Sequence, residues 1–212
     1  MIKRFQFNHI QVNTYVVYDG TKQCAVIDPG METPAEREEI LGFIEENGLI
    51  PKYILLTHSH IDHIAGLEAL CGKYNMPASL HPDAVGILHQ AGAYASVMGF
   101  DMDNLDNLPM RFIEDRDVLK FGETEIEALA VPGHAAGSMA YCMHDERVVF
   151  TGDAIFRQSI GRTDLPTGDY DQLIGNLKSK ILTLPNDYLL LPGHGPETTV
   201  GDEKKHNPFL NF

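Results

Sequence analysis

The stretch Thr57-His58-Ser59-His60-Ile61-Asp62-His63 contains three imidazoles and one carboxylate within six residues. It directly follows an apolar run at residues 53–56 that is typical of a buried strand. The first two histidines are two residues apart, so in an extended segment both side chains point to the same side. The aspartate and the third histidine fall where the chain turns into a helix, and they can point back at the same volume. Since histidine and carboxylate bind zinc-type ions, the stretch predicts a metal site.

A solvated cluster, or core histidines satisfied by the backbone, is the alternative explanation of this stretch. It would be preferred for a single histidine. Four ligand-type side chains beside one strand make it the less favourable interpretation, because so much titratable polarity is rarely placed there without a use.

Three further ligand-type residues follow predicted strands. His134 comes after residues 125–131, Asp153 after residues 148–151 and His194 after residues 188–191, each next to a glycine. One such residue alone is more often a polar cap or turn. Together with the cluster, they give five histidines and two aspartates, which suits two metals sharing a bridging ligand and is more than one metal can use.

The composition restricts the class of protein. The 212 residues include 16 Lys and Arg against 30 Asp and Glu, a net charge of −14, and 43% are hydrophobic. This is ordinary globular usage, and the acidic excess argues against nucleic-acid partners and anionic membranes. No apolar run is long enough to cross a bilayer, and the first residues do not resemble a secretory signal. Three widely spaced cysteines predict reduced thiols and a cytoplasmic location.

Local patterns predict one α/β domain over residues 1–212, with two sheets packed together and helices outside. Thr33 and Glu36 form a capping box before a helix that ends at Gly48, and Asp62 is expected to cap a second helix. Residues 99–110 are predicted to be a loop. The other expected elements are a hairpin at 14–19 and 24–28, helices at 82–98 and 169–182, and strands at 53–56, 78–80, 111–114, 118–121, 125–131, 139–143, 148–151 and 188–191.

The order of these motifs, HxHxDH followed by a lone His, a lone Asp and a final His, resembles the metallo-β-lactamase superfamily. The resemblance runs from the VIDPG at Asp28 to the GHGPETT at His194, and within the superfamily it is similar to small glyoxalase II-like hydrolases. It implies an α/β (α+β) fold, the four-layer αββα sandwich. It also implies one metal site of His58, His60 and His134, a second of Asp62, His63 and His194, and Asp153 bridging the two.

The resemblance further implies a thioesterase that acts on hydroxyacylglutathione-type substrates. Two divalent ions, most simply Zn with Fe or Mn as alternatives, would activate water, so no side-chain nucleophile is needed. Asp62 would orient the nucleophile as well as bind metal, and Asp28 and Thr57 would steady the ligand loops. Arg162, in a Gly-Arg-Thr-Asp turn, is expected to pair with a carboxylate of a small anionic thioester. The alternative is that Arg162 only holds the turn through Asp164.

Two other functions are compatible with the motifs. A persulfide dioxygenase shares the resemblance and would use one iron held by two histidines and one aspartate, and a metal-binding module without turnover would need the same ligands. The full seven-residue set favours hydrolysis. A β-lactamase proper is expected to be exported. Full-length glyoxalase II has an additional C-terminal helical domain that helps to hold glutathione, and this chain ends soon after His194, so that part of the pocket is expected to be absent. The five remaining histidines, at positions 9, 81, 89, 144 and 206, match no motif position.

Overall fold

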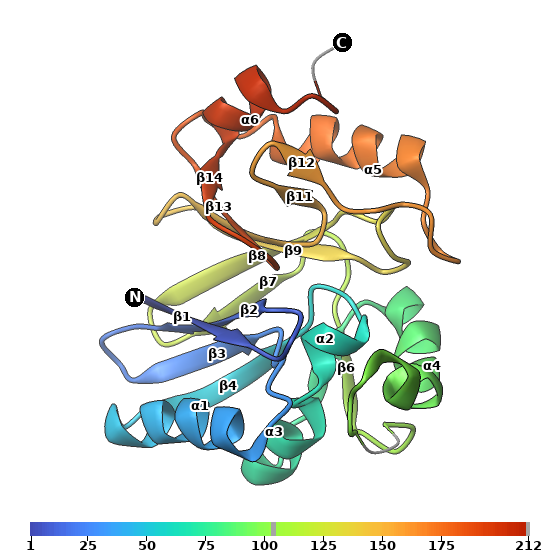
Figure 1. Ribbon diagram of the computed structural model, residues 1–212. Helices are drawn as coiled ribbons and strands as arrows, with labels where there is room; N and C mark the ends of the chain where they lie inside the picture. Colours follow the sequence, from blue (N-terminus) through green and yellow to red (C-terminus); the bar gives the residue numbers. More distant parts are fainter. Residues whose placement is uncertain (103–104, 211–212) are drawn as a thin grey trace.

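Two six-stranded sheets lie face to face in the computed structural model, and helices cover their outer sides (Figure 1). The structure describes residues 1–102 and 105–210. The first sheet contains β1 (Ile2–Phe7), β2 (Val12–Tyr18), β3 (Gln23–Ile27), β4 (Ile50–Leu55), β5 (Ala78–Leu80) and β6 (Met110–Phe112), in that order. The second has the order β14 (Thr198–Thr199), β13 (Leu189–Pro192), β10 (Val148–Gly152), β9 (Met139–Met143), β8 (Thr124–Ala130) and β7 (Val118–Phe121).

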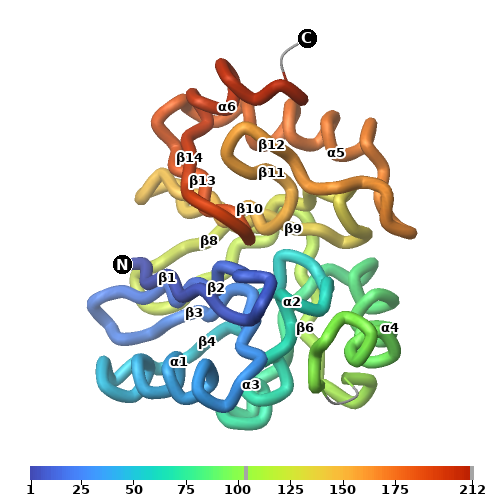
Figure 2. The backbone as a smooth tube through the Cα atoms, viewed as in Figure 1, coloured from blue at the N-terminus to red at the C-terminus, as the bar shows by residue number. Residues whose placement is uncertain are grey.

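The two halves of the chain form the two halves of the sandwich, as the backbone trace shows (Figure 2). β1, β2 and β3 are antiparallel neighbours, whereas β3, β4, β5 and β6 run parallel through helical crossovers. In the second sheet only β10 and β13 are parallel. This four-layer αββα arrangement confirms the fold class predicted from the sequence.

Strand alternation divides the core into an inter-sheet layer and two helix–sheet layers. Tyr15 and Val17 of β2 pack between the sheets against Tyr141 and Phe150, while Val16 faces the helices. The side-chain period of two along a strand makes this division. Outside the first sheet lie α1 (Pro34–Glu46) and α3 (Leu67–Tyr74), and outside the second lie α5 (Tyr170–Asn176), its π-helical continuation η3 (Leu177–Ile181) and α6 (Val200–His206).

Most predicted elements are present. The hairpin forms as β2 and β3. The capping box is complete, because Thr33 Oγ1 accepts from the Glu36 amide and the Glu36 carboxylate accepts from the Thr33 amide. The helix at 82–98 forms as η1 (Pro82–Ala84), α4 (Val85–Ala95) and η2 (Ser96–Met98). The described part of residues 99–110 lacks helix and strand up to Met110, and residues 103–104 lie outside the described residues.

The prediction that Asp62 caps a helix is wrong. The short helix α2 (Ile61–Ile64) begins after His60, and the side chain of Asp62 is occupied with histidines instead of the helix terminus. A separate α3 follows, because the chain bends at Gly66. There a Cβ would lie 2.5 Å from Met31 Cε and 3.0 Å from the Met31 carbonyl oxygen, so a larger residue would displace Met31.

The sequence patterns missed several short elements. These are β1 at the edge of the first sheet, β14, α6 and a small hairpin formed by β11 (Ile155–Phe156) and β12 (Ser159–Ile160). The three short strands have two residues each and α6 has seven, which is too short for hydrophobic periodicity to be informative, whereas β1 has six residues and was missed although a strand of that length can be predicted. Within residues 1–102 and 105–210, no helix is both long and apolar enough to span a bilayer.

Candidate metal centre

The seven ligand-type residues come from the carboxyl ends of four strands. The HxHxDH stretch follows β4, and His134, Asp153 and His194 follow β8, β10 and β13. Glycine brings the loops close together: a Cβ at Gly193 would lie 2.3 Å from Asp153 Oδ1 and 2.6 Å from His63 Cε1. Loops at strand ends are a common place for such sites, and here the two sheets bring all of them to one edge of the sandwich.

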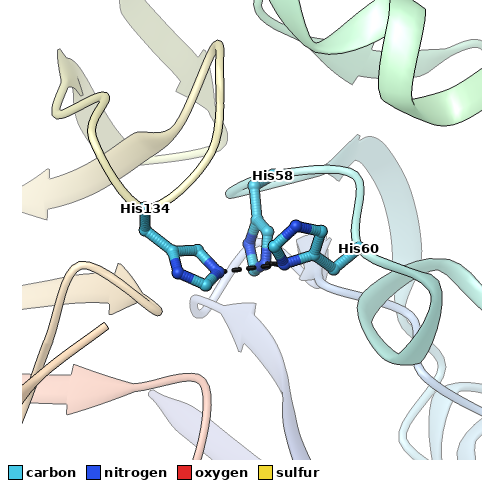
Figure 3. A group of neighbouring side chains, drawn as sticks. All are labelled: His58, His60 and His134. Atoms are coloured by element: carbon cyan, nitrogen blue, oxygen red, sulfur yellow. Dashed lines mark hydrogen bonds between the residues drawn. The ribbon is translucent and has the colours of Figure 1, made fainter. Parts of the chain in front are cut away.

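The first group consists of three imidazoles that face one another (Figure 3). His60 Nδ1 lies 3.0 Å from His58 Nε2 and 2.9 Å from His134 Nε2. Burial and, after it, the neighbouring histidines lower the pKa of His58 well below its ordinary value and that of His60 to about 4. The His58 and His60 rings are therefore neutral at pH 7.

The second group consists of Asp62, His63 and His194. His194 Nε2 lies 3.0 Å from Asp62 Oδ2 and 3.3 Å from His63 Nε2. Burial acts to lower the pKa of His63, but the carboxylates of Asp153, Asp62 and Asp28 outweigh it and raise that pKa well above its ordinary value. A cation is therefore favoured at this position, and a metal ion bound there would displace a proton.

Asp153 lies between the two groups. Its Oδ1 is 3.3 Å from His63 Nε2, and its Oδ2 is 3.7 Å from His194 Nε2 and 3.8 Å from His134 Nε2. The buried Oδ1 atom makes no hydrogen bond, although His63 Nε2 lies near it. A buried carboxylate oxygen without a hydrogen bond is costly, so the position of this carboxylate within reach of both groups fits a ligand shared by two cations.

Acceptor groups outside the centre fix the orientation of two rings. His63 Nδ1 lies 2.9 Å from Asp28 Oδ2, and His134 Nδ1 lies 2.8 Å from the carbonyl oxygen of Arg162. Both partners can only accept, so each Nδ1 carries a proton and donates it. In the neutral rings the Nε2 lone pairs then point into the centre, which is the form that binds metal.

Asp28 is itself held by a buried network. Its carboxylate accepts from the amide of Thr57 and from the Thr57 hydroxyl, each at 2.7 Å, besides His63. Asp28 and Thr57 thus lie where the resemblance placed them, behind the ligand loop. The donor set of neutral imidazoles and carboxylates fits divalent ions such as Zn, Fe or Mn.

The guanidinium of Arg162 does not contact either of the two ligand groups. Its guanidinium pairs bidentately with Asp164, with both N–O distances 2.7 Å, and the side chain is exposed. Its backbone carbonyl is the acceptor that orients His134. The contact with a substrate carboxylate, which the sequence suggested, remains a prediction that requires Arg162 to leave Asp164.

Two residues that support the centre were missed in the sequence. Asn8 has a φ of +53°, and its amide donates to the carbonyl oxygens of Asp62 and Gly30. Glu203 is buried and accepts from the Gln158 amide and the Thr198 hydroxyl, which anchors the β11–β12 hairpin that precedes Arg162. Neither has a signal in the sequence, since a lone Asn in a turn and an acidic residue in an exposed-looking GDEKK run are both common.

A cavity of about 640 Å³ opens directly over the centre. His60, Asp62, His134, Asp153 and His194 line its polar end. Substrate can therefore reach the converging ligands from this cavity. The five histidines outside the motifs do not belong to any of the described ligand groups.

The sequence model of the metallo-beta-lactamase superfamily matches residues 8–194, which include every ligand-type residue described above. This chain belongs to the metallo-beta-lactamase superfamily. The match covers most of the chain, and superfamily members of known structure share its architecture.

Curated superfamily members are similar over nearly the full length. The chain is 38% identical to the probable metallo-hydrolase YqgX of Bacillus subtilis over 209 residues, which cover 99% of this chain and 97% of the relative. It is 37% identical over 203 residues to the hydroxyacylglutathione hydrolase GloC of Haemophilus influenzae, covering 95% and 93%.

Solved structures of superfamily members agree with this architecture. BLEG-1, described as a B3 metallo-beta-lactamase, superimposes with a TM-score of 0.90 at 34% identity and covers 100% of both chains. TTHA1623, described in a di-iron-bound form, has a TM-score of 0.88 at 36% identity and covers 98% of this chain and 100% of its own. The chain is accordingly a member of this metallo-hydrolase superfamily, with histidine and aspartate groups able to bind metal.

Proposed function

We propose that the chain is a dinuclear metal-dependent thioesterase that acts on hydroxyacylglutathione-type thioesters. The observation that carries the proposal is the position of Asp153 between two ligand groups, with a buried oxygen that makes no hydrogen bond. The similarity to GloC supports the choice of thioester as the scissile bond. The donor set supports two divalent ions, with Zn as the expected metal and Fe or Mn as alternatives.

The chain's own residues would position the reactants. Two divalent ions at this centre lower the pKa of water towards neutrality and polarise a carbonyl group. Asp62, whose pKa is lowered by His63 and His194 in spite of burial, is a carboxylate at neutral pH and can accept a hydrogen bond from the attacking water. The water oxygen bonds to the acyl carbon, the carbon–sulfur bond breaks, and the products are a carboxylic acid and a thiol.

Arg162 is proposed to bind a carboxylate of the thiol portion. It lines the cavity, and Asp164 holds its guanidinium as a substrate carboxylate would hold it. Arg162 can exchange the Asp164 carboxylate for a substrate carboxylate without losing hydrogen bonds, because both are bidentate acceptors. The substrate is therefore proposed to be a small anionic thioester.

A cytoplasmic location is part of the same proposal. Cys24, Cys71 and Cys142 are free and buried, and burial raises the pKa of each thiol to about 12. Such thiols are unreactive and suit a reducing compartment, in which glutathione thioesters are available.

The test is a substrate panel on protein of measured metal content. Two ions per chain and hydrolysis of S-lactoylglutathione without oxygen uptake are expected. One iron per chain with oxygen uptake would indicate the persulfide dioxygenase instead. Cleavage of β-lactam amides alone would indicate the activity named for BLEG-1, and a fully loaded but inert protein would indicate a binding module.

The role of Arg162 is tested by a matched pair of variants. Arg162→Ala should lower kcat/KM for an anionic thioester by roughly 10–100-fold, the effect of losing one charged hydrogen-bonded contact, and should affect a neutral thioester much less. Arg157→Ala removes an exposed arginine from the nearby β11–β12 turn and should leave both substrates unaffected. Equal losses on both substrates with Arg162→Ala would mean that Arg162 only holds its turn.

A further inference from the structure

The cavity over the metal centre has an apolar wall that the chemistry of the ligands does not require. α4 and η2 supply one side of this wall, with Ile87, Ala91, Tyr94 and Met98 lining the cavity. Their spacing of four, three and four residues places them on one face of a continuous helix. Since the wall and the ligands line the same cavity, a molecule held at the centre also contacts this wall.

The outer part of this face lies outside the protein core. Tyr94 and Met98 are 61% and 48% exposed, whereas Ala91 and, on the adjacent side of the helix, Leu88 and Ala95 are buried. Large apolar side chains exposed beside a polar site lose contact with water when a ligand covers them. The wall therefore favours an apolar group of matching size.

The charges around the cavity point in the same direction. Among the described lining residues, Arg162 is the one arginine or lysine, and its guanidinium is paired with Asp164. Asp62 and Asp153 add negative charge at the centre. A charged group placed on the α4 wall would lose hydration without gaining an ion pair there.

We propose that the α4 wall binds the acyl group of the substrate and that, among anionic thioesters, those with larger apolar acyl groups are preferred. The inference rests on the proposed thioesterase function, in which the thiol portion carries the charge. The acyl group is then the part left for the apolar wall. The reaction remains hydrolysis of the carbon–sulfur bond by water, as written above.

Binding is measured first, independently of turnover. S-alkyl thioethers of glutathione, which have no thioester carbonyl and so cannot be hydrolysed there, are titrated calorimetrically into the metal-loaded protein. Affinity should rise about fourfold for each added methylene until the wall is covered. The double variant Tyr94→Ser, Met98→Ser should flatten this dependence. Val97→Ser is the control, because Val97 is 81% exposed on the same helical turn but does not line the cavity.

Turnover then separates the two proposals. Acetyl, butanoyl and hexanoyl thioesters of one thiol are compared in wild type and in both variants, and kcat/KM should rise with chain length except in the double variant. Hydrolysis without any dependence on chain length would overturn the acyl-wall proposal and leave the thioesterase intact. Chain-dependent thioether binding without hydrolysis would keep the apolar site and overturn the thioesterase. Equal effects of the Val97 and Tyr94–Met98 changes would also overturn the wall.

Discussion

The substitution Asp28→Asn tests whether the buried carboxylate behind the metal centre controls the protonation of His63. Asp28 Oδ1 accepts from the Thr57 amide, and Oδ2 accepts from the Thr57 hydroxyl and from His63 Nδ1. Asparagine has the same shape and tolerates the φ of +51° at this position. If the side-chain carbonyl of the new asparagine still accepts the hydrogen bond from the Thr57 amide, the side-chain NH₂ group takes the place of Oδ2 and faces His63.

The expected consequence is a change of tautomer. An NH₂ group donates, so His63 Nδ1 has to accept, and the ring proton moves to Nε2. The Nε2 lone pair that points at Asp62, Asp153 and His194 is then lost. Loss of a hydrogen-bond partner behind a ligating histidine lowers metal affinity about 10–100-fold, which is about 1.4–2.7 kcal/mol. The ion expected to bind more weakly is the one held by Asp62, His63 and His194. Replacing a charged acceptor by a neutral one should also lower the free energy of unfolding by about 1–2 kcal/mol.

Two measurements check this prediction. Competition with a chromophoric chelator gives the two metal affinities, and nitrogen NMR of the metal-loaded protein shows which ring nitrogen of His63 carries the proton. Thr57→Ser is the matched control, since it keeps the hydroxyl donor to Asp28 and should bind metal nearly as wild type does. If Asp28→Asn binds both ions with wild-type affinity and keeps the proton on Nδ1, Asp28 does not set the tautomer.

Three other outcomes are expected. Asp153→Ala should lose both ions and more activity than any single histidine variant, because Asp153 reaches both groups; tight retention of two ions, measured by elemental analysis, would exclude a shared ligand. Chelation should lower Tm, since bound metal adds about 4 kcal/mol at a thousandfold excess over Kd; an unchanged melt after confirmed metal loss would contradict this. Asp19 is partly buried, which raises its pKa, but hydrogen bonds from Thr21, the Glu123 amide and Thr124 outweigh burial and lower the pKa to about 2. Its carboxylate therefore stabilises the fold fully above its ordinary pKa of 3.8, by about 1 kcal/mol after solvent screening, and loses this as pH falls through about 2. In urea titrations at pH 5, Asp19→Asn should have a lower free energy of unfolding than wild type. If this difference is undiminished near pH 2, the ionised Asp19 carboxylate is not its cause.

Local sequence patterns predict many of the helices and strands. The capping box at Thr33 and the two runs of the hairpin at 14–19 and 24–28 are patterns within a few residues, and the structure confirms both. Two packed sheets with helices outside follow from such patterns together with the metallo-beta-lactamase resemblance. The elements that were missed, β1, β11, β12, β14 and α6, are short and depend on neighbours that are distant in sequence.

The candidate ligands could also be found from sequence, since residue type and position after a strand are local properties. Their mutual geometry could not. The hydrogen bonds from His63 to Asp28 and from His134 to the Arg162 carbonyl join residues 35 and 28 positions apart. Such contacts exist only after two sheets have packed and brought four strand ends to one edge.

Tertiary structure alone decided two further points. Asp62 was expected to cap a helix, but its side chain lies with His63 and His194, because those rings offer a buried carboxylate stronger partners than a helix terminus does. The α4 stripe is ordinary amphipathic sequence, which by itself is consistent with core packing. Only the packed sandwich leaves Tyr94 and Met98 exposed in the cavity beside the metal ligands, because the placement of an apolar face depends on which elements fold against it and not on its own periodicity.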